Sequence, residues 1–263
     1  GNGAVVSGTA SLTNTATAST TDGNGTTAAL VDNNVVQGIN LADLTVGNGA
    51  SITAGATSVQ TASAATVEDT GTIGNGSTAT VAGTDQISGL DTTNLTVGGS
   101  TSRLQATAAL TGAATASNVN GASTAAAGVG ADVTGAFGNG TAATDITVGN
   151  DLVGGAIFDA RSTLGATASS VGANATANAG DGATSVTGIN AVNLTVGDNA
   201  GTIFGQATST VTAAASTSGS LTGQNNATAN ALQVATGVLD TTTSIGGDGN
   251  LTALSSLNGT CLL

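Results

Sequence analysis

The sequence predicts an all-β protein, a parallel β-solenoid (β-helix) of about ten coils of roughly 25 residues that alternate between two coil types. Three observations predict it: a recurring Leu-Thr-Val-Gly segment, glycine-rich breaks between its copies, and a composition dominated by small residues without proline. Residues 1–263 are expected to form a single repeat domain.

The recurring segment is Leu44-Thr45-Val46-Gly47, and its copies begin at Leu95, Ile146 and Leu194, every 48 to 51 residues. A weaker copy is Ile245-Gly246-Gly247. Because threonine alternates with apolar residues, the apolar side chains are expected to point to one face of a strand, the buried one. The predicted structural core ladder is Leu44, Val46, Leu95, Val97, Ile146, Val148, Leu194 and Val196.

Glycine-rich breaks lie about midway between these segments. Examples are Gly74-Asn75-Gly76-Ser77 and Asn120-Gly121-Ala122-Ser123, and others begin at Gly23, Gly172 and Gly223. Glycine adopts the positive φ angles that corners of a coil require. Dividing the longer repeat at these breaks gives the predicted unit of roughly 25 residues.

The composition suits a long, narrow interior. The chain has 41 glycines, 1% aromatic residues and no proline, methionine, tryptophan, tyrosine or histidine. Proline removes a donor from a central β-ladder, so its absence fits a backbone that is hydrogen-bonded nearly throughout. Valine, isoleucine, leucine, alanine and threonine remain to fill the core.

The charge excludes several partners. The net charge is −13, and Arg103 and Arg161 are the two basic residues. Binding to nucleic acid requires clustered basic residues, and so does docking on an anionic membrane. No apolar run approaches the roughly 20 residues that span a bilayer, so no membrane insertion is expected.

Catalytic groups are scarce. Histidine, lysine and tyrosine supply most general bases, and the chain contains none of them. Asp159 and Arg161 lie close in sequence and are expected to form a surface ion pair. We expect no catalytic residue, no cofactor and no enzymatic activity; a carbohydrate-acting β-helix enzyme is the remaining alternative of this kind.

Polar residues precede the apolar segments: Asp43, Asn94, Asp145, Asn193 and Ser244. They are expected to form a turn-capping ladder along one edge, on every second coil. The alternative is a row of oxygen ligands for calcium, with Asp43 and Asp145 as candidates. Asp248, in Gly247-Asp248-Gly249, resembles one turn of a calcium-binding β-roll, but it stands alone.

Threonine-rich segments suggest a second ligand-binding alternative. Thr13-Asn14-Thr15-Ala16-Thr17 resembles the flat threonine arrays of ice-binding solenoids. Those arrays need Thr-x-Thr on the same face of every coil. Thr61-Ala62-Ser63 and Thr115-Ala116-Ser117 keep a small polar pattern without strict threonine.

The Asn/Asp-Leu-Thr-Val-Gly-Asn/Asp copies, with Ala/Thr/Ser-rich tracts between them, resemble the large repetitive β-strand proteins of bacterial, especially cyanobacterial, cell surfaces. The resemblance extends over nearly the whole chain. It implies an extracellular, cell-surface role as a filament, surface-layer or adhesin protein, and it transfers no specific functional residue.

Self-assembly is the expected partner interaction. A solenoid exposes unpaired backbone groups at both ends, and these ends need caps to keep the protein monomeric. The C-terminal segment is apolar rather than polar, so head-to-tail association into a homopolymer is predicted, with residues 251–263 as the strand inserted into a neighbour. The candidate assembly residues are Leu254, Leu257, Cys261, Leu262 and Leu263.

Overall fold

The protein is an all-β structure whose strands pair in parallel. A computed structural model describes residues 3–21, 25–31, 33–66, 76–82, 85–99, 101–129, 132–136, 143–149, 155–180, 185–197, 200–217, 226–231, 233–240 and 242–263. Every strand pairing among these residues is parallel. Across the same residues there is no helix that could cross a membrane. The predicted all-β, parallel class is confirmed.

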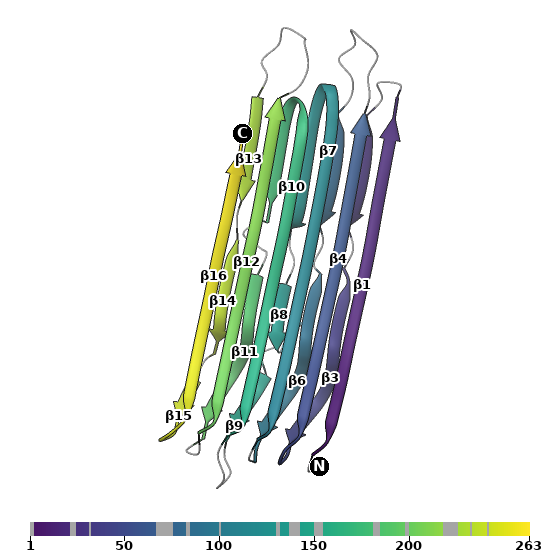
Figure 1. Ribbon diagram of the computed structural model, residues 1–263. Helices are drawn as coiled ribbons and strands as arrows, with labels where there is room; N and C mark the ends of the chain where they lie inside the picture. The colour runs from purple at the N-terminus through teal and green to yellow at the C-terminus, as the bar shows by residue number, and fades with distance from the viewer. Residues whose placement is uncertain are drawn as a thin grey trace.

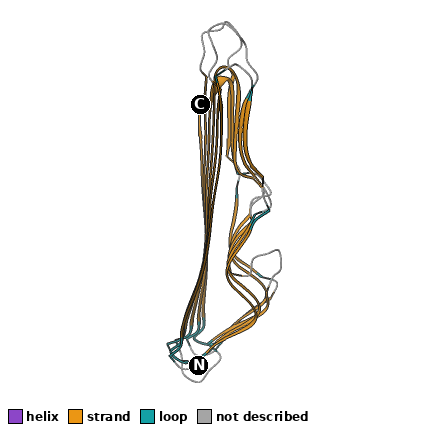
Figure 2. Ribbon diagram, turned by 90° about the vertical axis from the view of Figure 1, so that its right-hand side faces the viewer, coloured by secondary structure: helices purple, strands orange, loops and turns teal. Residues whose placement is uncertain are grey.

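The strands form two layers (Figures 1 and 2). The long sheet, in front in Figure 1, has the order β1-β4-β7-β10-β12-β16. Its strands are β1 (Val5–Thr20), β4 (Ser51–Thr66), β7 (Arg103–Val129), β10 (Ile157–Ala179), β12 (Thr202–Thr217) and β16 (Asn250–Leu262).

The return layer lies behind the long sheet and runs in the opposite direction (Figure 2). Its upper part contains β2 (Thr26–Val31), β5 (Ser77–Ala82), β13 (Asn226–Ala231) and the ends of β7 and β10. Its lower part contains β3 (Val35–Val46), β6 (Gln86–Val97), β8 (Asp132–Ala136), β9 (Ala143–Val148), β11 (Ser185–Val196), β14 (Val234–Leu239) and β15 (Thr242–Ile245).

The repeat that stacks is the long one. Paired residues lie 45 to 54 positions apart along the chain; Ile157 pairs with Thr202 and Arg103 with Ile157 at these extremes. The prediction of about ten units of roughly 25 residues is therefore wrong. One passage up the long sheet and one down the return layer together use about 50 residues, so the two predicted coil types correspond to the two layers.

The glycine-rich breaks explain this error. Asn120 to Ser123 lies inside β7 and Gly172 to Ala175 inside β10, where each strand passes from one layer to the other (Figure 1). A break thus marks a corner rather than a completed turn. The breaks at 23–24, 74–75 and 223–225 lie outside the described residues.

Alternating side chains build the long sheet. In β4, alternate residues from Ile52 to Thr66 are buried, and most of them are alanine, serine or other small residues. The inward rows stack by register, as in Ile52, Leu104, Phe158 and Ile203. These four residues are buried and belong to one hydrophobic cluster.

The interior consists of two clusters. The upper one is mostly alanine, with Leu110, Leu164 and Val211, while the lower one holds the larger Phe158 and Leu104. Small upper residues let the two layers approach closely, which accounts for a core almost without aromatic rings.

A row of glycines separates the two clusters. We call each successive strand position of the return layer a level. The row contains one residue from each of the five levels, in β3, β6, β8, β11 and β14: Gly38, Gly89, Gly135, Gly188 and Gly237. A Cβ at any of them would lie closer than 3.0 Å to backbone atoms. At Gly89 these are the carbonyl oxygen and amide nitrogen of Thr107, at 2.5 and 2.6 Å. The layers therefore meet backbone to backbone here, at a place we call the glycine waist.

Candidate assembly interface

The two edge strands of the long sheet lie at opposite ends of the stack (Figure 1). β1 (VVSGTASLTNTATAST) and β16 (NLTALSSLNGTCL) contain no charged residue and no proline. Natural sheets block exposed edges with charges, proline, bulges or a covering element. Long, uncharged edges of this kind are templates for pairing with another strand.

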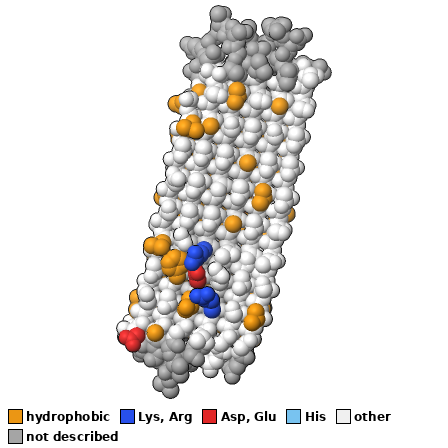
Figure 3. Space-filling model, in the orientation of Figure 1, with side chains coloured by type: hydrophobic (Ala, Val, Ile, Leu, Met, Phe, Trp, Pro, Cys, Tyr) orange, Lys and Arg blue, Asp and Glu red, His pale blue; other side chains and the backbone are white. Residues whose placement is uncertain are grey.

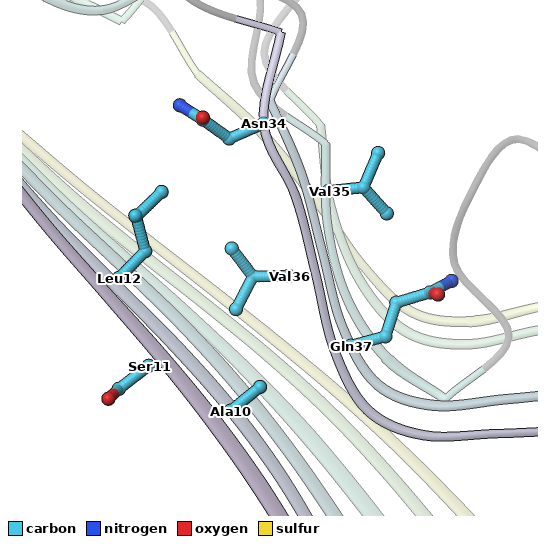
Figure 4. Close-up of a pocket in the computed structure, with 7 residues that line it drawn as sticks. All are labelled: Ala10, Ser11, Leu12, Asn34, Val35, Val36 and Gln37. Atoms are coloured by element: carbon cyan, nitrogen blue, oxygen red, sulfur yellow. The ribbon is translucent and has the colours of Figure 1, made fainter.

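A cavity opens at the β1 end of the stack (Figure 4). It has a volume of about 410 Å³ and is lined by Ala10, Ser11, Leu12, Asn34, Val35, Val36 and Gln37. The Nδ2 atom of Asn34 is buried and has no hydrogen-bond partner in the part of the chain that the structure describes. A buried donor without an acceptor is costly, which marks this end of the interior as incomplete.

A buried carboxylate lies one level further in. Asp85 is 3% exposed and accepts hydrogen bonds from the backbone nitrogen of Asn34, at 2.8 Å, and from Nε2 of Gln60. Gln60 is itself buried, on the inward side of β4. This polar group inside an apolar interior was not anticipated from the sequence.

The predicted assembly residues lie on β16 or directly after it. Leu254, Leu257 and Leu262 are about half exposed, Leu263 more so, and Cys261 is an exposed free thiol. By register, Leu257 follows Ser209 and Cys261 follows Ala213, so both side chains continue inward rows. The segment pairs with β12 of its own chain on one side, and its association with a neighbouring copy stays a prediction.

The predicted core ladder lies in the lower cluster. Val46, Leu95, Val97, Ile146, Val148, Leu194 and Val196 are each at most 1% exposed. Leu44 is partly buried and packs against the same cluster. Register places Leu44, Leu95, Ile146 and Leu194 in one row and the valines in the next.

The polar ladder runs along the outer side of the same strands. Asn94 Nδ2 donates to Asp43 Oδ1 at 2.7 Å, and Asn193 Nδ2 donates to Asp145 Oδ1 at 2.9 Å. Its members occupy successive levels, because Asp43 pairs with Asn94, Asn94 with Asp145 and Asp145 with Asn193. The expected position on every second coil is therefore wrong. Ser244 is also misassigned, since it pairs with Thr195 while Thr242 opposes Asn193.

Alternation of carboxylate and amide keeps like charges apart. Asn94 separates the carboxylates of Asp43 and Asp145 by two strand spacings, about 9.6 Å. Asp248 lies in a separate turn between β15 and β16. Within the described residues, no three acidic, histidine or cysteine side chains form a group that could hold a metal ion.

The ladder predicts a charge-specific response to substitution at its middle. Asn94→Asp should place three carboxylates on successive levels and cost about 0.5–1 kcal/mol of unfolding free energy. The loss should shrink in high salt, because salt screens exposed charges. Denaturant unfolding at low and high ionic strength measures this. Asn94→Thr, which imitates Thr242, is the uncharged control and should show no salt dependence; equal salt responses of the two variants would contradict the ladder.

Both arginines lie on the outer face of the long sheet, where Figure 3 shows charged groups gathered beside hydrophobic ones on a mostly uncharged surface. Arg161 forms a bidentate ion pair with Asp159, with both N–O distances 2.9 Å. The guanidinium also lies 5.1 Å from the centre of the Phe204 ring. Its hydrogen bond to Asp159 raises the pKa of Arg161. The expected surface ion pair is present, and it is satisfied internally.

Asp91 is a second perturbed charge, on β6. Burial raises the pKa of this carboxyl above its ordinary value of 3.8, and a 2.6 Å hydrogen bond from Nε2 of Gln37 partly opposes the rise. Because the pKa of Asp91 is raised in the folded state, the free energy of unfolding decreases as the pH rises from 3.8 through the folded-state pKa and the carboxyl ionises.

Threonines also line the outer face of the long sheet. Register aligns Thr15, Thr61, Ala113, Thr167, Thr212 and Thr260 in one row. The neighbouring row begins at Thr13 and continues with Val59, Thr111, Gly165, Thr210 and Asn258. Even the most regular row is interrupted, so the face lacks the strict pattern that ice-binding arrays need.

Comparison with protein-family models, with curated proteins and with solved structures found no match to this chain. The features that point to a function are therefore its own: two uncharged edge strands, an incomplete interior at one end, and an ion pair on an otherwise mostly uncharged face.

Proposed function

We propose that the chain is a non-catalytic structural protein, a parallel β-solenoid with turns of about 50 residues that assembles head to tail into an extracellular fibre. One observation carries the proposal: the uncharged, proline-free edge strands β1 and β16 at opposite ends of the stack. Contacts between different ends of identical subunits generate open filaments when no rotation closes them into a ring.

Further features support a structural role over a catalytic one. Arg161 is engaged by Asp159 in a bidentate ion pair, so its charge is balanced within the chain. The net charge of −13 keeps assemblies soluble and mutually repelling. The resemblance to repetitive bacterial surface proteins supports placement at the cell surface, as matrix or adhesive fibre.

Blocking one edge tests the proposal. The amide of Ser51 donates to the carbonyl of Ala4, so the even-numbered residues of β1 direct their backbone groups toward β4. Because successive residues of a strand alternate, the amide of Thr9 faces the open side of β1. Thr9→Pro removes that donor without removing a hydrogen bond inside the chain. Electron microscopy and sedimentation should show fibres for the wild type and single particles for Thr9→Pro.

The control keeps the shape of the side chain and the amide. Thr9→Val is nearly isosteric, and its side chain is exposed, so this variant should assemble like the wild type. A wild type that remains monomeric at high concentration would refute the fibre. Fibres of Thr9→Pro that equal those of Thr9→Val would exclude the β1 edge as the contact.

A further inference from the structure

One backbone hydrogen bond repeats at every level of the long sheet. The amide of the first residue of each strand donates to a carbonyl of the neighbouring strand, that of the residue directly before its first residue. The series begins with the amide of Ser51 and the carbonyl of Ala4, at 2.8 Å, and ends with the amide of Asn250 and the carbonyl of Gly201, also at 2.8 Å. The three intermediate bonds, from Arg103, Ile157 and Thr202, are each 2.9 Å long. In this series the carbonyl of Gly249 is the next acceptor and the amide of Val5 is the next donor.

A second series runs along the lower end of the return layer. Gly98 donates to Val46, Gly149 to Val97, Gly197 to Val148 and Gly246 to Val196, at 2.7–2.9 Å. In this series the carbonyl of Ile245 is the next acceptor and the amide of Gly47 is the next donor. Each layer therefore ends in a backbone donor at one end of the stack and a backbone acceptor at the other.

The inward rows match at the two ends as well. Strand pairing makes Val6 equivalent to Leu251, Leu12 to Leu257 and Ala16 to Cys261. Val6 with Leu251 and Leu12 with Leu257 are aliphatic pairs, and Ala16 and Cys261 are both small. Leu12 packs partly against the upper cluster, while Leu257 is 54% exposed, and among the described strands β16 pairs with β12 alone.

We propose that β16 of one copy pairs in parallel with β1 of a second copy, with Asn250 opposite Val5 and Cys261 opposite Ala16. The proposal deepens the proposed fibre function and rests on it. In this register the inward rows and the hydrogen-bond series of the long sheet continue from one copy into the next.

The return layer behaves differently at the junction. The long sheet has six strands along its path, whereas the lower return layer has five levels, β3, β6, β8 with β9, β11, and β14 with β15. Pairing of β16 with β1 thus brings neighbouring return levels to about twice the normal 4.8 Å spacing, so the amide of Gly47 and the carbonyl of Ile245 do not meet across the junction. The cavity lined by Leu12, Asn34 and Val36 lies at this position, so each junction contains a slot about one strand wide.

Cysteine cross-linking tests the register directly, because Cys261 is the chain's one cysteine. Neighbouring strands bring paired Cα atoms within disulfide range, so Ala16→Cys should form intermolecular disulfides with Cys261 on mild oxidation of fibres. Within one chain, positions 16 and 261 are five strand spacings apart, about 24 Å, which prevents internal closure. Asn14→Cys and Ala18→Cys, displaced by two residues along the same face, are the matched controls.

The expected result is a ladder of covalent oligomers for Ala16→Cys, little for either control, and loss of the ladder in Ala16→Cys/Cys261→Ser. Cross-linking that favours position 14 or 18 would overturn the register. Fibres without cross-links at any position would overturn the β16–β1 contact and leave the fibre function standing. Absence of any assembly, by sedimentation of the wild type, would overturn both.

Discussion

Val97→Asp should reduce the free energy of unfolding by several kcal/mol, because it places an unpaired carboxylate in an apolar interior. Val97 is fully buried, and register places Val46 and Val148 directly beside it. Neither neighbour supplies a hydrogen-bond donor from its side chain. Lowering the pH should reduce the loss, since protonation removes the charge while leaving the polar group buried.

Thr96→Asp is the matched control for Val97→Asp. Thr96 is the preceding residue of β6, is exposed, and lies between Thr45 and Thr147 on the outer side. A surface substitution of this kind should change stability by no more than about 0.5 kcal/mol. Denaturant unfolding at low protein concentration compares the two. Similar losses for both variants would refute the inward assignment of Val97.

The strand class and the core ladder could be predicted because their signals are local. In Leu95-Thr96-Val97, alternation alone determines which side chains share a face, and recurrence every 48 to 51 residues indicates that the copies stack. The size of a turn depends on longer-range geometry. A glycine-rich break such as Asn120 to Ser123 looks the same whether it ends a turn or lets one strand bend into the other layer.

The candidate site was predictable only in part. The apolar, uncharged C-terminal segment indicated a strand at an open sheet edge, and β16 is an edge strand of the long sheet. Its pairing with β12 depends on the register of the whole sheet, which one segment does not encode. The cavity beside Asn34 and the buried Asp85 arise where two layers meet, and the sequence of one layer does not show which residues of the other lie opposite it.

The recurrence of the glycines of the glycine waist could be seen in the sequence, but their structural role could not. Gly38-Ile39-Asn40 and Gly89-Leu90-Asp91 recur before the apolar segments, as do Gly188-Ile189-Asn190 and Gly237-Val238. A recurring glycine can indicate a turn, a bulge or a close approach. The structure distinguishes them, since Gly89 lies within β6 and is not among the residues with positive φ. Because Gly89 has no side chain, the backbone of Thr107 in the long sheet can pack directly against it.

Gly89→Ala should therefore destabilise the protein by about 3 kcal/mol, the upper end of the range for overpacking. Its Cβ would lie 2.5–2.6 Å from backbone atoms of Thr107 and Gly135, which cannot rotate away as a side chain can. The layers would have to separate at the waist and loosen the clusters on both sides.

Gly165→Ala is the control, because its Cβ would meet only the Thr111 hydroxyl, at 4.0 Å. Since alanine restricts the unfolded chain more than glycine does, this variant should be neutral or stabilised by up to about 1 kcal/mol. Guanidinium unfolding, followed by circular dichroism at low protein concentration, measures both variants. A Gly89→Ala midpoint equal to that of Gly165→Ala would show that the two layers do not meet backbone to backbone at the waist.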